Sequence, residues 1–577
     1  MPNETLEALF NEIADLLEIK GEDAFRVNSY RRVARTIKNL TEDIAEVAAR
    51  GGLSDLQGVG KSTAAKIEQY IKTGKIDLHE ELRASIPKGL PELLNIPGMG
   101  PKKVALAWKE LGVEDVAGLK KVIASGEFAA LKGMGEKSVQ QIAQGLAFAE
   151  KSGERTPLGL AWPLAEELAQ AMRGVKSVRR VEIGGSLRRG CETIGDLDLL
   201  CESDDGPAVI QAFTKLPQVR RVLSEGDTKG SIVVERRDGA EMQADCRVVP
   251  KASFGAALQY FTGSKEHNVR LRGLAVKKKW TLNEWGLFDG DRLLAGADEA
   301  GIYKKLGLPM MPPEVREDRG EFDADAEAFA ELITLKDIRG DLHMHTHASD
   351  GTTDAHTMAE AARDLGYEYI AITDHSRSSA QANGLSLDRM WRQIEHLRKL
   401  NDKHDTVAIL VGCECDILAD GKLDYPDTIL AACDIVVASV HQALRQERSR
   451  ITRRVMKAME NPFVTILGHP TGRLLNRRAP MDLDLAAIIE QAARTHTVLE
   501  LNASWQRLDL CDRYVRMARD AGVMLSIDTD AHSTAQLTQM RYGITTARRG
   551  WLRAKDVLNT MPLAAMRRWI ARKRKHA

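Results

Sequence analysis

Short apolar runs that each end on a histidine or a carboxylate place the strongest constraint on how this chain folds. From about residue 341 to residue 527 these runs alternate with helical segments, which is the pattern of strands that lie parallel in one sheet and are joined by helices. The runs are residues 369–373, 409–412, 436–440, 465–468 and 524–527. Because the carboxyl ends of parallel strands share one edge of a sheet, we predict a barrel-like α/β domain with a polar site at that edge.

The polar residues at these strand ends are of the types that bind metal ions. His343 and His345 form a His-x-His pair at the start of the region, and a strand end presents both imidazoles toward one cavity. The full set is His343, His345, Asp350, His375, Glu414, His441, His469, Asp530 and His532. Mixed histidine and carboxylate ligands suit Zn²⁺ or Mn²⁺, and such ions lower the pKa of a bound water. The sequence therefore predicts a site for two or three metal ions. Glu500 and Asn502 end another strand run, either as partners of these ligands or as structural residues.

A second group of residues, nearer the middle of the chain, predicts chemistry of another kind. Gly184-Gly-Ser-Leu-Arg-Arg-Gly190 is followed by Asp196-Leu-Asp198. Side chains two apart on a strand share one face, so both aspartates can hold the same pair of divalent cations. Asp245, on the next strong strand candidate at 242–249, would complete a site for in-line phosphoryl transfer. Gly185 and Ser186, with the two arginines, offer the amides, hydroxyl and guanidinium groups that hold a triphosphate.

The first 150 residues are helical by period and contain one element three times. Gln57-Gly-Val-Gly-Lys61, Ile96-Pro-Gly-Met-Gly-Pro101 and Lys132-Gly-Met-Gly-Glu136 each precede an amphipathic helix. This is the helix-hairpin-helix pattern, in which glycines let backbone amides approach a DNA phosphate. The candidate DNA-binding glycines are Gly58, Gly60, Gly98, Gly100, Gly133 and Gly135. The alternative for any one copy is a glycine-capped helical hairpin that binds nothing.

Length and composition limit the class of protein without deciding its ligand. A chain of 577 residues has room for several domains. Its net charge of zero gives no argument for nucleic-acid binding, which has to rest on local sites. The seven scattered cysteines favour a reducing compartment, and residues 1–20 form an amphipathic helix rather than a signal peptide. With no apolar run of about 18 residues, we expect a cytoplasmic protein without a membrane partner.

The chain resembles DNA polymerase family X over about residues 1–320, on the evidence of the Gly-Ser and Asp-x-Asp segments and of Tyr260-Phe-Thr-Gly-Ser264. The resemblance implies that Asp196, Asp198 and Asp245 bind Mg²⁺ or Mn²⁺. It also implies that a monomeric enzyme fills short gaps in nicked or gapped DNA with dNTPs during repair. The residues that match the family's nucleotide contacts are Arg155, Gly185, Ser186, Arg189, Gly195, Tyr260, Phe261, Gly263, Asn268 and Arg272.

Three positions depart from the vertebrate repair members of that family. Lys265 stands where those enzymes have an acidic residue, and Gln243 replaces an arginine. Lys66 matches the Schiff-base lysine of the family's 5′-deoxyribose phosphate lyase, but Ser62 replaces a basic residue that helps to hold the 5′-phosphate. Lys66 is therefore either a lyase nucleophile or an exposed helix lysine.

Residues 341–570 resemble the PHP (polymerase and histidinol phosphatase) domain, which implies a distorted (βα)7-type barrel. In a protein that joins this domain to a polymerase-like region, the resemblance implies metal-dependent 3′-5′ exonuclease, 3′-end-processing or abasic-site nuclease activity on DNA. The alternatives are a small-molecule phosphatase of the histidinol phosphate type with a DNA-binding module, a nucleotidyltransferase that acts on RNA or a small molecule, and a non-catalytic DNA scaffold.

The expected architecture is therefore multidomain. Residues 1–85 form a helical domain that binds DNA ends or acts as a lyase, and 86–153 a helix-hairpin-helix domain. Residues 154–250 form an α+β nucleotidyltransferase palm and 251–317 a thumb that selects the nucleotide. Residues 318–340 are a linker, and 341–577 form the PHP domain.

Overall fold

The computed structural model describes residues 2–576 except 41–42, 97–98, 132–133, 136–137, 140–141, 144–145, 147–154 and 403–406. It divides into two compact units. One unit contains residues 1–154 with 239–241, and the other contains 155–238 with 242–577. Within the described residues, no helix is long and apolar enough to span a lipid bilayer.

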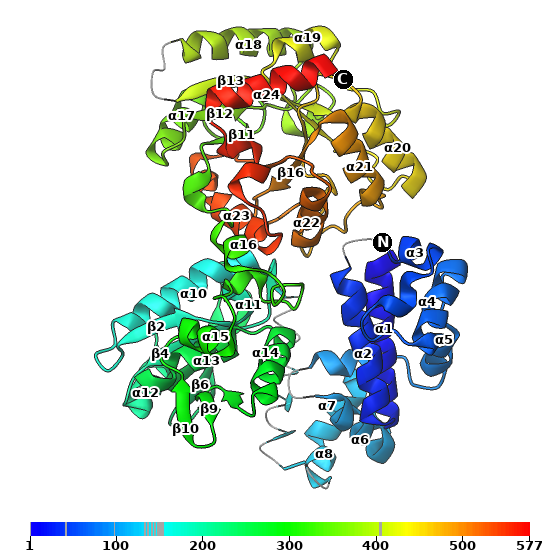
Figure 1. Cartoon of the computed structure of the whole chain (residues 1–577), viewed down its shortest axis with the longest axis vertical. Coiled ribbons are helices and arrows are strands. Elements are labelled where there is room, and N and C mark those ends of the chain that lie inside the picture. Colours follow the sequence, from blue (N-terminus) through cyan, green and yellow to red (C-terminus); the bar gives the residue numbers. More distant parts are fainter. Residues whose placement is uncertain are drawn as a thin grey trace. The chain divides into compact units, whose positions relative to one another are not determined.

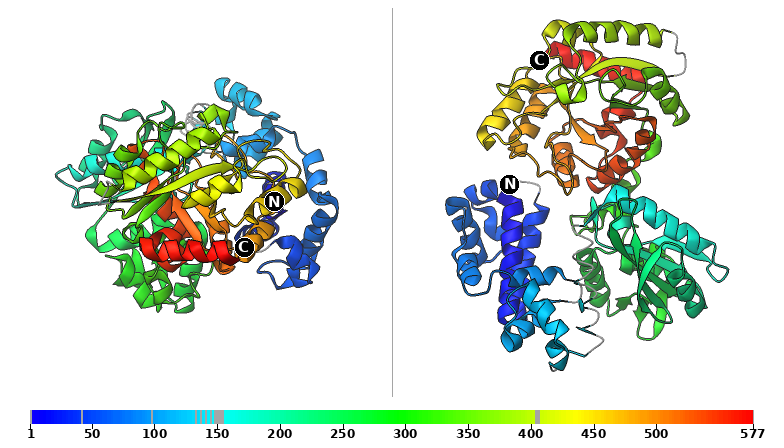
Figure 2. Two further views of the ribbon diagram at one scale, coloured as in Figure 1. Left: turned by 90° about the horizontal axis from the view of Figure 1, so that it is seen from above. Right: turned by 180° about the vertical axis from the view of Figure 1, so that it is seen from behind.

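The N-terminal unit is built from helices, as all three views of the ribbon show (Figures 1 and 2). The expected helix at 1–20 is confirmed as α1, and its apolar face packs on α2 through Phe10, Leu17 and Val33. Asp23 caps α2 by accepting hydrogen bonds from two backbone amides of its first turn. The helices are α1 (Pro2–Lys20), α2 (Ala24–Asn39), α3 (Ile44–Ala49), α4 (Lys61–Thr73), α5 (Asp77–Ala84), α6 (Pro101–Leu111), α7 (Val116–Ala124) and α8 (Glu127–Ala130). A single apolar core runs from Leu6 to Leu146.

The second unit begins with a five-stranded central sheet in the order β2-β4-β7-β6-β5. The strand expected at 242–249 is confirmed as β7. The central strand β4 pairs parallel with β7 and antiparallel with β2, while α10 and α12 pack against the sheet. The elements are β1 (Thr156–Pro157), α10 (Leu158–Arg173), β2 (Arg180–Ile183), α11 (Gly185–Arg188), β3 (Thr193–Ile194), β4 (Leu197–Glu202), α12 (Gly206–Thr214), β5 (Val219–Glu225), β6 (Lys229–Glu235) and β7 (Glu241–Val249).

A small helical region with a three-stranded sheet follows the central sheet. Its elements are α13 (Phe254–Thr262), α14 (Lys265–Lys277), β8 (Thr281–Asn283), β9 (Gly286–Asp289), β10 (Arg292–Ala295) and α15 (Glu299–Leu306). Residues 318–340, expected as a linker, contain the short helix α16 (Ala326–Ala330), and the Phe329 ring there lies 5.6 Å from that of Trp551. Arg316 is completely buried, and its guanidinium donates to Glu299, which also receives two hydrogen bonds from Arg188.

Glu299→Gln is expected to lower the free energy of unfolding by about 3 kcal/mol at neutral pH, because it leaves the buried Arg316 charge without its partner. Burial alone would raise the pKa of Glu299, but Arg316 and Arg188 have the larger effect and lower it to about 2. Since this folded-state pKa lies below the unfolded value, the carboxylate contributes stability above about pH 4.5 that is lost as the pH falls toward 2. Urea unfolding of both proteins should show the full difference at about pH 7 and a smaller one at about pH 4. An equal difference at both pH values would contradict this account.

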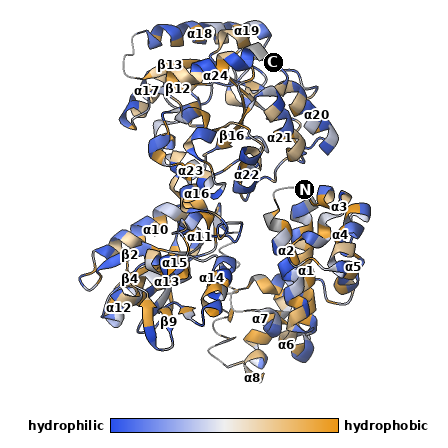
Figure 3. Ribbon diagram, viewed as in Figure 1, coloured by the Kyte–Doolittle hydropathy of each residue, from blue (hydrophilic) through white to orange (hydrophobic). Residues whose placement is uncertain are grey.

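The C-terminal part is a seven-stranded parallel sheet in sequential order, β11 to β17, which confirms the expected barrel-like α/β domain. The strands are β11 (Gly340–Met344), β12 (Tyr369–Ile372), β13 (Ala408–Asp416), β14 (Ile435–Ser439), β15 (Ile466–Leu467), β16 (Val498–Asn502) and β17 (Leu525–Asp528). The barrel nearly closes, because Met344 bridges to Ala531 and the buried Asn559 amide donates to the backbone of Gly340 and Ile527. Strand β12 is apolar along its length, and β13 is apolar over its first part, before Glu414 and Asp416, as the colours of Figure 3 show.

Helices surround this barrel and link its strands (Figure 1). Helices α17 and α18 pack on β12 and β13, and α23 packs on β16 and β17. The helices are α17 (Ala355–Asp364), α18 (Leu387–Asn401), α19 (Asp427–Ala432), α20 (Arg448–Met459), α21 (Leu485–Thr495), α22 (Asp512–Asp520), α23 (Met540–Arg549) and α24 (Leu563–His576).

Candidate active sites

The three predicted aspartates lie together at one end of the central sheet. Asp198 on β4 stands directly opposite Asp245 on β7, and Asp196 immediately precedes β4. Burial, and then repulsion from Asp196 and Asp245, raises the pKa of Asp198 to about 7. Burial and the Asp245 carboxylate also raise the pKa of Asp196. Three carboxylates that destabilise one another in this way form a site that hard divalent cations would stabilise.

Asp245 is paired with two neighbouring side chains. Lys229, the first residue of β6, places its Nζ 3.2 Å from Asp245 Oδ2, and Gln243 Nε2 donates to Oδ1 at 2.8 Å. Gln243 stands where the vertebrate enzymes have an arginine, so here Lys229 brings the positive charge. Sequence reasoning missed Lys229, because the strand that contributes it shows no motif. The three carboxylates are not among the tight ligand groups that the described residues form.

The loop that precedes α11 lies against Asp198. Gly185 has a φ of +63°, and a Cβ there would lie 2.2 Å from Asp198 Oδ2, so only glycine allows this approach. Ser186 is half-buried on α11. Arg155 donates to the carbonyl and hydroxyl of Thr193, and its Nη1 would lie 2.9 Å from a Cβ placed on Gly195. These predicted nucleotide contacts therefore surround the aspartates on the central sheet.

Arg189 lies between this loop and the segment at 260–263. Its Nη1 donates to the Thr262 carbonyl, its Nε pairs with Glu317 at 3.0 Å, and a Cβ on Gly263 would lie 3.2 Å from Nη1. The neighbouring Tyr260 and Phe261 rings meet edge to face at 5.1 Å.

The two remaining candidates of this region lie on α14. The amide of Asn268 is buried, accepting from Gln259 and donating to the carbonyl of Tyr260. Arg272 is exposed, and its Nε lies 3.3 Å from the carbonyl of Asn268. Asn268 is therefore positioned to support the 260–263 segment, whereas Arg272 is open to a ligand from solvent.

The candidate DNA-binding glycines precede helices in the N-terminal unit. Gly60 and Gly100 are the N-cap residues of α4 and α6, and space for a Cβ is open at Gly60, Gly100 and Gly135. Gly58 has a φ of +82°, and a Cβ there would meet Arg32 at 2.5 Å. Gly98 and Gly133 lie outside the described residues. Lys66 lies on α4, where its Nζ donates to Ser62 Oγ at 2.9 Å.

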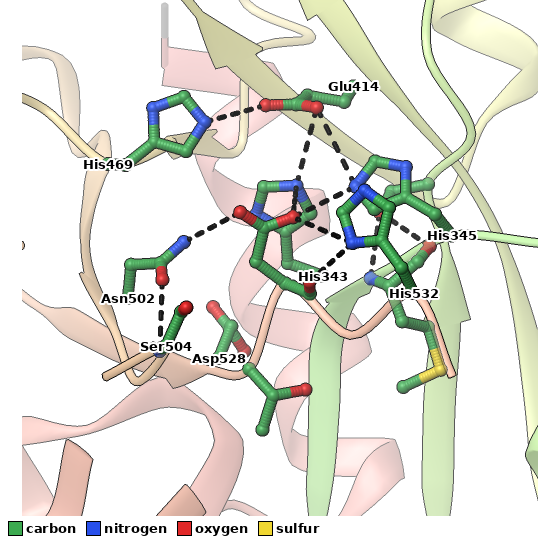
Figure 4. A network of polar contacts seen from close by, with 12 residues as sticks. His343, His345, Glu414, His469, Asn502, Ser504, Asp528 and His532 are labelled. Atoms are coloured by element: carbon green, nitrogen blue, oxygen red, sulfur yellow. Dashed lines mark hydrogen bonds and ion pairs between the residues drawn. The ribbon is translucent and has the colours of Figure 1, made fainter. Parts of the chain in front are cut away.

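All nine predicted metal ligands converge at the carboxyl-terminal edge of the barrel strands. Among the described residues, three groups have ligand atoms within 4.8 Å of one another. The groups are His345, Asp350, His375 and His532; His343, His345 and Asp530; and His375, Glu414 and His441. The ninth residue, His469, lies 3.0 Å from Glu414 through its Nε2. Figure 4 shows His343, His345 and His469 around the Glu414 side chain.

Buried carboxylates outside this set orient the imidazoles. His343 Nδ1 lies 2.6 Å from Glu500, which leaves its Nε2 directed toward Glu414 and Asp530. His441 Nδ1 pairs with Asp416 at 2.5 Å in the same manner. Such outer partners fix the tautomer and the ring orientation of metal-binding histidines. Of the two readings of Glu500, the structure favours that of a ligand partner. Sequence reasoning missed Asp416, which is the last residue of β13.

The protonation of His345 also fits metal binding. Burial, together with the imidazoles of His375 and His532, lowers the pKa of His345 to about 3, so the ring is neutral. Among the described residues, His343 Nε2 and His345 Nδ1 are buried without a hydrogen-bond partner. Buried polar atoms without partners are costly unless an ion satisfies them, so the donor set fits divalent cations.

Arg507 is a further residue of this site that sequence reasoning missed. Its Nε lies 3.4 Å from Asp530 Oδ2, and its buried Nη1 has no hydrogen-bond partner among the described residues. A guanidinium beside the ligand cluster can take up a phosphate. The available signal was an arginine five residues after Asn502, in the loop that follows β16.

Comparisons with known proteins agree with this division into sites. Residues 1–76 match the helix-hairpin-helix domain, 90–147 the SAM-like helix-hairpin-helix tandem, 257–317 the DNA polymerase beta thumb and 341–504 the PHP domain. Probable phosphatases of Thermoanaerobacter and Shewanella sediminis are 27% and 29% identical, but over only 38% and 39% of this chain, with 90% and 91% of their own length covered.

One relative covers nearly the whole chain. The DNA polymerase/3′-5′ exonuclease PolX of Bacillus subtilis is 38% identical over 566 residues, which is 98% of either protein. That extent includes both the central sheet and the barrel, whereas the phosphatases match only 38% and 39% of the chain. The chain therefore belongs to the PolX family of DNA polymerases that carry a PHP domain.

Proposed function

We propose that this chain is a family X DNA polymerase that fills short gaps in DNA with dNTPs, and that its barrel is a metal-dependent 3′-5′ exonuclease. The observation that best supports this proposal is the pairing of Asp198 with Asp245 beside Asp196. The same chain also brings together the nine predicted metal ligands. Likeness to the PolX of Bacillus subtilis over 98% of the chain supports both activities. Its site of action is the cytoplasm, and it works as a monomer on nicked or gapped DNA.

In the polymerase site, Asp196, Asp198 and Asp245 would hold Mg²⁺ or Mn²⁺. The ions supply the positive charge that nucleotidyl transfer requires. Ser186, Arg189 and Arg155 bind the triphosphate, and Tyr260, Phe261 and Gly263 lie against the sugar. Asp245 accepts the proton of the attacking 3′-hydroxyl, and the 2.8 Å hydrogen bond from Gln243 holds its carboxylate in place.

In the barrel, the nine ligands would hold two or three ions of Zn²⁺ or Mn²⁺. The ions supply a nucleophilic water at neutral pH and neutralise the phosphodiester. Glu500 and Asp416 keep the His343 and His441 rings turned toward the site. Arg507 binds the phosphate that is cleaved.

Arg507→Ala is expected to reduce exonuclease kcat/KM by about 100-fold, the cost of losing a charge-assisted contact to the reacting phosphate. Arg507→Lys keeps the positive charge but lacks the paired N–H donors of a guanidinium, so it should recover part of the lost activity. Primer extension by both variants should stay at the wild-type rate. The measurement is release of nucleotides from a labelled single strand. If Arg507→Ala cleaves at the wild-type rate, the assignment of Arg507 to the nuclease site is wrong.

The rival small-molecule phosphatase is separated from this proposal by substrate preference. We expect kcat/KM for a DNA 3′ end to exceed that for histidinol phosphate by about 100-fold or more, because a site that binds an extended strand gains contacts along the backbone. Both substrates are compared with one metal-loaded preparation. A preference for histidinol phosphate, with no incorporation of dNTPs into gapped DNA, would favour the phosphatase.

A further inference from the structure

The segment between the start of α11 and the first catalytic aspartate contacts the barrel at two places. This segment, residues 189–195, joins Arg189 to Asp196. It packs against helix α23 near residue 190 and against the loop after β15 near residue 192. The central sheet and the barrel also share an apolar core, in which Leu508 and Tyr542 of the barrel lie among residues of the central sheet.

Helix α23 approaches the start of this segment closely. Gly190 has a φ of +66°, and a Cβ there would lie 1.9 Å from Thr545 Cγ2. Four residues further along α23, Arg549 Nη1 donates to the Arg189 carbonyl at 2.8 Å. The Arg549 side chain is 8% exposed, so this contact is made away from solvent.

A second barrel arginine contacts the middle of the segment. Arg473 donates to the Glu192 carboxylate at 2.7 and 3.3 Å, and also to the carbonyls of Arg507 and Leu508. In the same loop, the Asn476 amide donates to the carbonyl of Arg155 at 2.6 Å. Side chains of the barrel therefore contact the first residue of the segment, its Glu192 side chain and the backbone of Arg155.

Arg549 also controls the charge around Arg189. Both arginines contact the same oxygen of Glu317, Arg189 at 3.0 Å and Arg549 at 2.9 Å. Burial alone would raise the pKa of Glu317, but Arg549 and Arg189 have the larger effect and lower it to about 2. Glu317 is therefore a carboxylate at neutral pH. With Arg549 present, two guanidinium groups share the Glu317 carboxylate, and Arg549 also pairs with Asp512 at 2.9 Å. Without Arg549, Glu317 would pair with Arg189 alone and compete with the triphosphate for it.

We propose that Arg549 of the barrel is a positioning residue of the polymerase site, which keeps Arg189 in place and available to the triphosphate of the incoming nucleotide. This inference rests on the proposed polymerase function. It makes the barrel a working part of nucleotide binding as well as a separate nuclease.

The test is steady-state incorporation of one dNTP into gapped DNA by the full-length chain. Arg549→Gln should raise KM for the dNTP about tenfold and change kcat by less than about threefold, since residues of one ion-pair network couple by amounts of this size. Adding Glu317→Gln to Arg549→Gln removes the competing carboxylate, so the double variant should recover most of the KM. A purely structural role of Arg549 would give no such recovery.

Arg541→Gln is the matched control, because Arg541 also lies on α23 and pairs outside the barrel, with Glu166 on α10, rather than with residues 189–195. Its KM should equal that of the wild type, and both variants should degrade single-stranded DNA normally. An unchanged KM in Arg549→Gln, an equal rise in Arg541→Gln, or the absence of recovery in the double variant would overturn the inference. If the wild type itself incorporates no dNTP, the proposed function fails instead.

Discussion

Asp198→Asn is expected to reduce primer extension by at least about 1,000-fold while 3′-end degradation continues at the wild-type rate. The substitution keeps the size of the side chain but removes one of three facing charges, so the remaining pair binds divalent cations poorly. The measurement is single-turnover extension of a labelled primer at a one-nucleotide gap. Because the pKa of Asp198 lies near 7, cations have to displace a proton there, and the concentration of metal needed by the wild type should fall as the pH rises through neutrality.

Asp204→Asn is the control for that variant. Asp204 lies just beyond the other end of β4, is 67% exposed and pairs with Arg179 rather than with the site. Its extension rate should match that of the wild type. If Asp198→Asn extends a primer within tenfold of the wild-type rate, the assignment of the polymerase site to β4 and β7 is wrong.

His343→Asn is expected to lower 3′-5′ exonuclease activity by at least about 1,000-fold and to leave extension unchanged. His343 is completely buried, Glu500 fixes its ring, and its Nε2 faces two carboxylates. Loss of this imidazole removes a ligand at the centre of the cluster, so metal content should also fall, as measured by elemental analysis of the purified protein.

The exposed His396 on α18 provides the matched control, since it has no part in the ligand groups. His396→Asn should retain metal and nuclease activity. Full nuclease activity in His343→Asn would show that cleavage takes place elsewhere in the chain.

The barrel site could be predicted from sequence because its signal is local. Each ligand follows or ends an apolar strand run, and parallel strands bring their carboxyl ends together whatever the intervening loops contain. His343 and Glu414 differ slightly, since they lie inside β11 and β13 rather than after them. The pairing of Asp198 with Asp245 was accessible for a similar reason, because both lie on strong strand patterns.

The remaining features depend on packing between distant segments. Lys229 reaches Asp245 only because β6 lies next to β7, and Arg507 reaches Asp530 from a loop. The contact of Gly190 with Thr545 joins residues that are far apart in sequence. No periodicity or spacing marks such pairs, so the dependence of the 189–195 segment on the barrel could be found only in the structure.

The most direct test of two separate catalytic sites is one assay of extension and degradation of a labelled primer on one-nucleotide-gapped DNA, with dNTPs and Mn²⁺. It compares the wild type with the double variants Asp196→Ala with Asp198→Ala and His343→Ala with His345→Ala. The account predicts that the first variant loses only extension and that the second loses only degradation. Extension that survives loss of the aspartates, or degradation that survives loss of the histidines, would contradict it.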